Sequence, residues 1–97
     1  MGMKQKIMIV DDAEINRQIL MAILGDKYEY VQAENGCQAV HMLQHDLTID
    51  LILLDINMPE MNGFQVLDRM NTFHWINDIP VIMISSEEKK DVIERAY

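Results

Sequence analysis

Short, largely apolar segments alternate along the chain with segments in which apolar residues recur every three or four positions. The four segments of strand length span residues 6–10, 28–33, 50–54 and 81–85. Segments that are apolar on both faces are typical of strands buried in a parallel sheet. The second segment mixes polar and apolar positions, which is typical of an edge strand.

Helical periodicity fills the intervals between these strands. The predicted helices span residues 13–24 and 36–45, begin near residue 62 or 63, and begin again near residue 86. In the first helix an apolar stripe comprises Ile15, Ile19, Leu20, Ile23 and Leu24, and in the third Phe64, Leu67 and Met70 share a face. This alternation predicts parallel strands, right-handed crossovers and helices on both faces of the sheet.

Composition limits the function classes. The chain has 97 residues, enough for one small domain, and 49% of them are apolar, enough for a core. Its net charge of -8 argues against direct binding of nucleic acid and suits cations or a positively charged partner. The longest unbroken apolar run, Ile19 to Leu24, is too short to span a membrane. A single cysteine, Cys37, and the lack of a signal-peptide pattern predict a cytoplasmic location.

Acidic residues follow two of the buried strands. Asp11 and Asp12 follow the first strand, and Asp55 follows the third. Carboxyl ends of parallel strands lie at one rim of a sheet, where three carboxylates repel one another until one takes up a proton or a cation binds. Mg²⁺, which favours oxygen ligands, is the expected cation. Taken singly, Asp12 is equally a helix N-cap and Asp11 a solvated acid.

Two other metal sites were weighed. A calcium loop beginning at Asp55 is excluded, because Pro59, Glu60 and Val66 stand where that loop needs an oxygen ligand, a glycine and a glutamate. His41 and His45 have the helical spacing of a zinc pair but no evident third ligand, so we interpret them as a solvated helix surface. Cys37 is expected to be a buried or half-buried thiol.

Together, these motifs resemble the receiver domain of bacterial two-component response regulators. The matching parts are Asp11-Asp12, the segment 53–59, Gly63 and the segment 80–86, in the right order and at the right separation. The resemblance covers essentially the whole chain. It implies a flavodoxin-like doubly wound α/β fold, a parallel sheet of strand order 2-1-3-4.

The resemblance also implies a role for each site residue. Asp55 is the phosphoacceptor, which receives a phosphoryl group from a sensor histidine kinase or a phosphotransfer protein. Asp12, Asp55 and the backbone carbonyl of Asn57 bind Mg²⁺ directly, and Asp11 acts mostly through a metal-bound water. Ser85 is the switch hydroxyl. Such a domain promotes its own phosphorylation and dephosphorylation, switches conformation for a downstream output, and is not an enzyme in the ordinary sense.

Three residues carry local alternatives. Ser85 and Glu88 have capping-box spacing, so Ser85 also suits the start of a helix, and both roles can hold. Pro59 is expected to be structural. Gly63 either supplies a backbone shape that other residues resist or lets its helix approach closely.

The receiver pattern continues beyond what this chain supplies. The fifth strand, its terminal lysine and the fifth helix are lacking, and Lys89 and Lys90 do not fit the lysine's place. The chain therefore resembles a C-terminally truncated receiver domain. Because the strand at 81–85 lacks the charge or proline that protects edges, we expect it to pair with another neighbour or to support self-association.

Two other functions compete with a phosphoacceptor domain. Phosphatase-like hydrolases with an aspartate nucleophile usually carry Asp-x-Asp on the first strand, and Asp11-Asp12-Ala13 does not fit that pattern. The alternative is a truncated binding-only module that has lost the phosphorylation switch and acts through its surface.

Overall fold

The computed structural model describes residues 4–46, 48–74 and 78–84. The strands are β1 (Lys6–Val10), β2 (Glu29–Ala33), β3 (Leu51–Asp55) and β4 (Val81–Ile84). The helices are α1 (Glu14–Leu24), α2 (Gly36–His45) and α3 (Gly63–Thr72). All neighbouring strands pair in parallel, in the order β2-β1-β3-β4, which confirms the predicted fold class and strand order.

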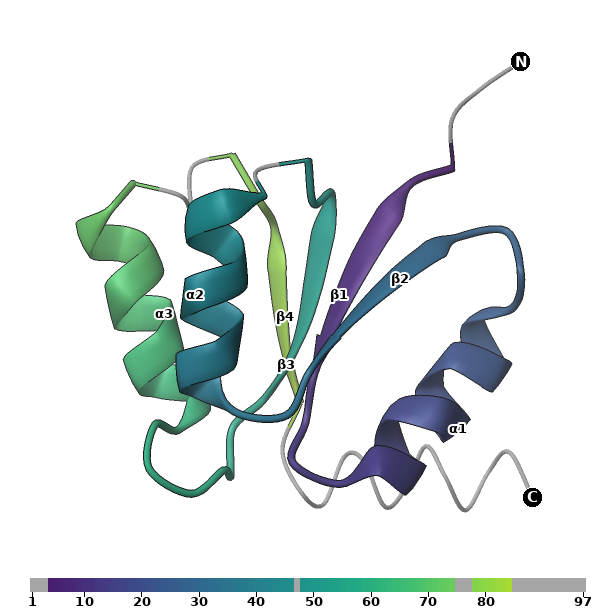
Figure 1. Cartoon of the computed structure of the whole chain (residues 1–97), viewed down its shortest axis with the longest axis horizontal. Helices are drawn as coiled ribbons and strands as arrows, with labels where there is room; N and C mark the ends of the chain where they lie inside the picture. The colour runs from purple at the N-terminus through teal and green to yellow at the C-terminus, as the bar shows by residue number, and fades with distance from the viewer. Residues whose placement is uncertain (1–3, 47, 75–77, 85–97) are drawn as a thin grey trace.

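Helices cover both faces of the sheet. Figure 1 shows α2 and α3 together on one face and α1 on the other. Successive strand residues point to opposite faces, so Met8 and Ile52 pack under α2 and α3, whereas Ile7, Ile9 and Leu53 pack with Leu20 of α1. The central strands β1 and β3 are thus buried on both faces, as their apolar sequences predicted, whereas β4 is only partly buried although it is equally apolar. In the described part of the chain, no helix is long and apolar enough to cross a membrane.

The predicted apolar stripe of the first helix is partly wrong. Leu20 is buried, but Ile15 and Ile23 are 62% and 45% exposed. Residues are about 100° apart around a helix, so Ile15 and Leu24 point in opposite directions and cannot share one buried face. The side that packs on the sheet carries Leu20 and Arg17, and Arg17 is only 6% exposed.

Two smaller predictions also fail. Phe64 of α3 is 59% exposed, and the buried side chains of that helix are Val66 and Met70, one turn apart. This pair packs into the core that α2 and α3 share. Cys37 is exposed rather than buried, because it lies on the side of α2 opposite the core residues Ala39 and Leu43.

Close approach explains Gly63. A Cβ on this residue would lie 2.6 Å from the backbone oxygen of Asp55 and 2.9 Å from Cα of Ile56. Its amide also donates to the carbonyl of Ile56 at 2.9 Å. The preceding residue, Asn62, caps α3 in a capping box with Gln65. The start of α3 is therefore held directly against the end of β3, where Asp55 lies.

Candidate functional site

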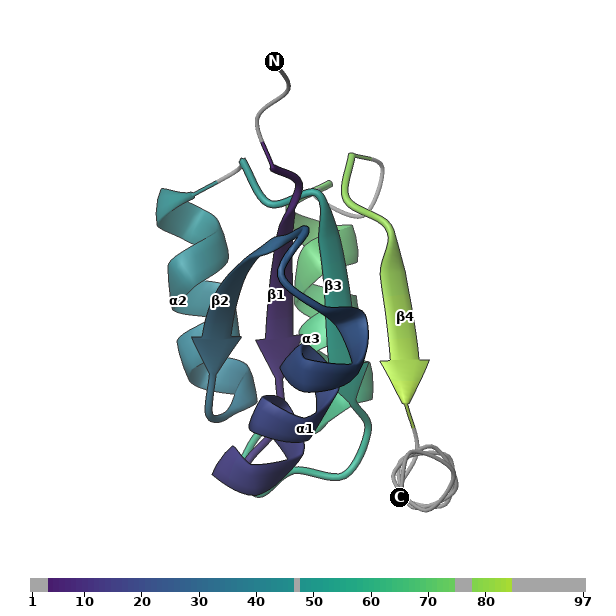
Figure 2. The same cartoon turned by 90° about the vertical axis from the view of Figure 1, so that its right-hand side faces the viewer.

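Three acidic side chains converge at the carboxyl ends of β1 and β3. These strands are neighbours, and their register pairs Val10 with Leu54, so the residues that follow lie side by side. One carboxylate oxygen from each of Asp11, Asp12 and Asp55 lies within 4.8 Å of the other two. In Figure 2 this rim is the lower one, to which the arrowheads of β1, β2 and β4 point. The predicted convergence of the three acids is present.

Burial divides the three acids into two kinds. Asp11 and Asp55 are 1% and 2% exposed, whereas Asp12 is exposed. Two like charges so close together inside a protein are stable only with compensating hydrogen bonds or counter-charge. The exposed Asp12 leaves the cluster a side that solvent can reach.

Backbone hydrogen bonds fix Asp11. Its amide donates to the carbonyl of Ala33 on β2 at 3.1 Å, and its Oδ1 accepts from the amide of Ala13 at 2.9 Å. Its own carbonyl accepts from Nη1 of Arg17 at 2.6 Å. The N-cap residue of α1 is Ala13, with no side-chain cap, so Asp12 does not serve as the N-cap.

The β3 side of the site is equally constrained. The amide of Asn57 donates to Oδ1 of Asp55 at 3.1 Å, which places Asn57 beside the acids. The amide of Ile56 donates to the carbonyl of Ile84 at 3.1 Å, so β4 ends next to this loop. Ser85, the predicted switch hydroxyl, lies outside the described residues.

The donor set fits a hard divalent cation. Oxygens bound on opposite sides of one Mg²⁺ are about 4 Å apart, from its bonds of about 2.1 Å. The three carboxylate oxygens of the cluster lie within 4.8 Å of one another, so they are close enough to share a single ion, directly or through a metal-bound water. Among the described residues, no other group of three or more His, Cys, Asp or Glu ligands is as compact.

Among the described residues, no third ligand joins the histidine pair that has zinc-site spacing. The rings of His41 and His45 lie edge to face with their centres 4.7 Å apart on α2. Cys37, one turn earlier on the same helix, does not complete a three-ligand group with them. The interpretation of these histidines as a helix surface stands for the described part of the chain.

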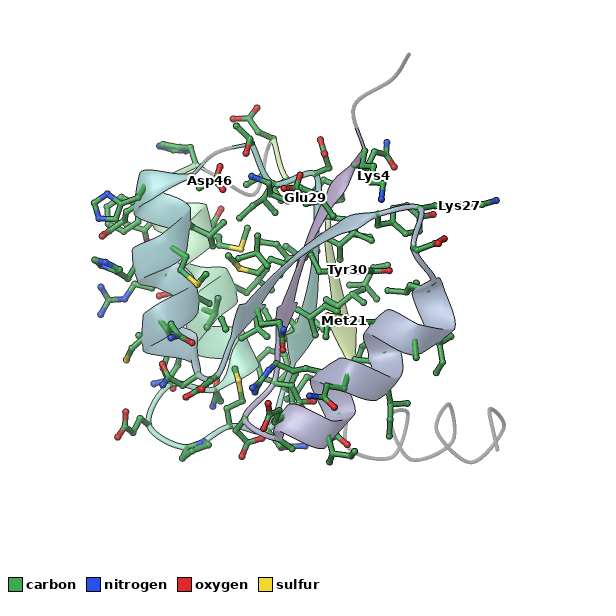
Figure 3. All side chains as sticks on the ribbon, turned by 45° about the vertical axis from the view of Figure 1, so that its right-hand side comes forward. Lys4, Met21, Lys27, Glu29, Tyr30 and Asp46 are labelled. Atoms are coloured by element: carbon green, nitrogen blue, oxygen red, sulfur yellow. The ribbon has the colours of Figure 1, made fainter. Side chains whose placement is uncertain are left out.

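A second polar cluster lies at the opposite rim. Lys6 Nζ lies 3.0 Å from Oδ2 of Asp46 and 2.8 Å from Oγ1 of Thr48. Hydrogen bonds from the Thr48 hydroxyl and amide, then from Lys6, lower the pKa of Asp46 to about 2. This rim also carries a hollow of about 760 Å³ lined in part by Lys4 and Glu29, and Figure 3 labels both at the same end of the sheet as Asp46. The cluster ties the start of β1 to the end of α2, away from the three acids.

Sequence reasoning missed Arg17. It lies three residues before the buried Leu20, so helical spacing alone placed it on the core side of α1. Its charge suggested a solvated position, and acceptors from two other segments are what make its burial possible. Nε donates to Oε1 of Gln32 on β2 at 2.9 Å, and Nη1 donates to Asp11 as described above.

Comparisons with known proteins match this geometry. The family model for the response regulator receiver domain matches residues 7–97. The two-component response regulator ORR3 of Oryza sativa subsp. indica is 32% identical over 90 residues, which cover 92% of this chain and 69% of that protein.

Solved structures agree with the sequence relatives. The chemotaxis protein CheY4 of Vibrio cholerae superposes with a TM-score of 0.78 at 29% identity, covering 97% of this chain and 80% of that one. A chain from the co-crystal structure of the Saccharomyces cerevisiae phosphotransfer protein Ypd1 and the receiver domain of Ssk1 gives a TM-score of 0.70 at 28% identity, covering 84% and 62%. The similar proteins come from a plant, a bacterium and a yeast, so the resemblance is not confined to bacteria.

Proposed function

The chain belongs to the response regulator receiver domain family, and on that premise we propose that Asp55 accepts a phosphoryl group in a Mg²⁺-dependent reaction. The observation that carries the proposal is the convergence of three carboxylate oxygens within 4.8 Å at the carboxyl rim of the sheet. Receiver domains of two-component systems accept phosphoryl groups from histidine kinases or phosphotransfer proteins. We extend that activity to this chain through its own residues.

Asp12, Asp55 and the backbone carbonyl of Asn57 would bind the metal directly, with Asp11 acting through a bound water. When bound, Mg²⁺ would neutralise negative charge on the phosphoryl oxygens. The hydrogen bond from the Asn57 amide to Oδ1 of Asp55 orients the acceptor carboxylate. Burial of Asp55 limits access of bulk water to it.

The transfer itself is a simple displacement. A carboxylate oxygen of Asp55 forms a bond to phosphorus while the phosphorus–nitrogen bond of a phosphohistidine donor breaks, and the bonding pair stays on the imidazole. The product is an aspartyl phosphate. Ser85, which directly follows β4 in the sequence, would turn toward the new phosphoryl group and begin the conformational change read by the output.

A partner must bring its phosphohistidine to this rim. Ile15, in the first turn of α1 and three residues after Asp12, is 62% exposed. Single exposed apolar side chains are common on protein surfaces, so the assignment of Ile15 depends on its position one turn from Asp12 as well as on its exposure. We therefore assign Ile15 to partner docking.

The cytoplasmic location remains a prediction.

Intact mass spectrometry tests the acceptor function. The chain is incubated with acetyl phosphate and Mg²⁺, with EDTA in a parallel sample. We expect a gain of one phosphoryl group with Mg²⁺ and none with EDTA or in Asp55→Asn. The control Asp78→Asn, at an exposed position, should label like wild type. A folded wild-type chain that gains no mass would favour the binding-only module.

A matched pair of donors tests the docking assignment. Ile15→Asp should slow transfer from a phosphorylated phosphotransfer protein while leaving labelling by acetyl phosphate unchanged. Equal loss with both donors would mean that Ile15 serves the site itself rather than the partner.

The outer edge of β4 supports a second interaction. In the part of the chain that the structure describes, no strand pairs with that edge, and Ile82 is 51% exposed. An unprotected apolar edge favours pairing with another chain, so self-association through β4 remains part of the proposal. Sedimentation that shows a monomer at all concentrations would rule it out.

A further inference from the structure

Arg17 joins three segments at one buried point. Its guanidinium, on a side chain that is 6% exposed, reaches the end of β1 through the carbonyl of Asp11 and reaches β2 through the side chain of Gln32. Arg17 itself lies in the second turn of α1, where its amide bonds to Ala13. The guanidinium thus ties the start of α1 to both strands.

A buried guanidinium needs this arrangement to be stable. Arginine is rarely buried unless its donors are paired, because an unpaired buried charge is costly. Its planar fork presents several donors in fixed directions, which lets one side chain span two acceptors in different segments. The ammonium of lysine is a compact donor that cannot reproduce that span.

The hydrogen bonds of Asp11 show how the Arg17 guanidinium fixes its backbone. The last register pair between β1 and β2 is Val10 with Ala33. Beyond that pair, the amide of Asp11 bonds to the Ala33 carbonyl, and Arg17 holds the Asp11 carbonyl at 2.6 Å. With both backbone groups held, the point from which the Asp11 side chain projects is fixed, and the bond that Oδ1 accepts from the amide of Ala13 orients the carboxylate.

We propose that Arg17 is a positioning residue, which holds Asp11 in the geometry that the metal site needs by bonding its backbone carbonyl and Gln32 at once. The metal part of this inference rests on the proposed function. Arg17 touches neither substrate nor metal, and it acts through the backbone of Asp11.

A purely electrostatic role and a positioning role predict opposite effects of a substitution at Arg17. If Arg17 mattered only as a nearby positive charge, its removal would strengthen cation binding and Arg17→Lys would match wild type. If Arg17 positions Asp11, Arg17→Lys weakens Mg²⁺ binding although the charge is kept. Loss of a group that supports a metal site from outside its direct ligands typically costs about tenfold or more in metal affinity.

The experiment is a Mg²⁺ titration followed by amide NMR. The variants are Arg17→Lys and Gln32→Leu, with Arg69→Lys at an exposed position on α3 as the matched control. We expect half-saturation at about tenfold higher Mg²⁺ for Arg17→Lys and a smaller increase for Gln32→Leu. Arg69→Lys should titrate like wild type.

Hydrogen exchange of the Asp11 amide gives a readout that does not depend on the metal. Its bond to Ala33 should open more often in Arg17→Lys than in Arg69→Lys, and exchange should be correspondingly faster. Wild-type Mg²⁺ affinity and wild-type exchange in Arg17→Lys would overturn the inference. If Arg17→Lys does not fold, Gln32→Leu decides, because Gln32 is an exposed residue. An unchanged Mg²⁺ titration and unchanged Asp11 amide exchange in that variant would overturn the inference too. A wild-type chain that binds no Mg²⁺ would refute the proposed function, and the exchange comparison would still test the role of Arg17.

Discussion

Replacing Asp12 with asparagine should stabilise the metal-free fold while destroying its response to Mg²⁺. The side chains have nearly the same shape, so packing is conserved and the main change is the loss of one negative charge. That charge lies within 4.8 Å of oxygens from two other acids, Asp11 and Asp55. In the unfolded chain the charges of Asp12 and Asp55 are far apart, so their repulsion destabilises only the folded state.

The size of the effect follows from Coulomb's law. Two charges 4.8 Å apart repel by about 1 kcal/mol in water and about 3 kcal/mol at the effective dielectric of a protein surface. Asp12 is exposed, so the lower value applies. Asp11 is its neighbour in the sequence and stays close to it in the unfolded chain, so only the pair with Asp55 counts, which gives about 1 kcal/mol. Part of this is offset by the solvation that the charge of Asp12 loses in the variant, so the expected net gain is at most about 1 kcal/mol, or at most about 4–8 °C in melting temperature.

Thermal unfolding in EDTA at low salt measures this gain. Asp12→Asn should melt higher than wild type, and the difference should shrink at high salt because an exposed charge is screened. Asp68→Asn, at an exposed position on α3, corrects for the general effect of reducing a net charge of -8. With Mg²⁺ present the wild-type melting temperature should rise and that of Asp12→Asn should not. A variant that melts no higher than the control in EDTA would refute the electrostatic reasoning.

Two further changes test the surroundings of the site. Gly63→Ala places a Cβ 2.6 Å from the backbone oxygen of Asp55. It should therefore destabilise the fold by about 1–3 kcal/mol and slow phosphorylation of Asp55. An unchanged urea midpoint would contradict the close approach of α3 to β3. Asp46→Asn should destabilise the protein at pH 7. Because the pKa of Asp46 is lowered from 3.8 to about 2 on folding, its contribution is present above pH 4 and is lost as the pH falls toward 2. The stability difference from wild type, measured by urea unfolding, should therefore shrink over that interval, and a constant difference would exclude this role for Asp46.

Much of the fold follows from local patterns. Apolar strands that alternate with helices predicted a parallel sheet, and the family resemblance supplied its strand order. The observed order places the strands that precede Asp11 and Asp55 side by side. The strand mixed in polarity, β2, is an edge strand as predicted. The convergence of the three acids was predictable because it depends only on the sheet topology, that is, on which strands are parallel and which are adjacent.

Side-chain burial on helices was harder to predict. Apolar residues surround much of α1, so the sequence could not indicate that Leu20 packs inward while Ile15 faces solvent. Arg17 was missed because its burial depends on acceptors from β1 and β2 that only the tertiary fold brings to it. The roles of Asp11, Asp12, Asp55, Asn57 and Ser85 remain predictions.

Chemical trapping tests the central claim most directly, because it identifies which of three neighbouring carboxylates carries the phosphoryl group. Borohydride reduces an aspartyl phosphate to homoserine, and peptide mass spectrometry then locates the converted residue. After labelling with acetyl phosphate and Mg²⁺, the account predicts homoserine at position 55 and unchanged aspartate at positions 11 and 12. Conversion at Asp11 or Asp12, or a phosphoryl group found on His41 or His45 instead, would contradict it.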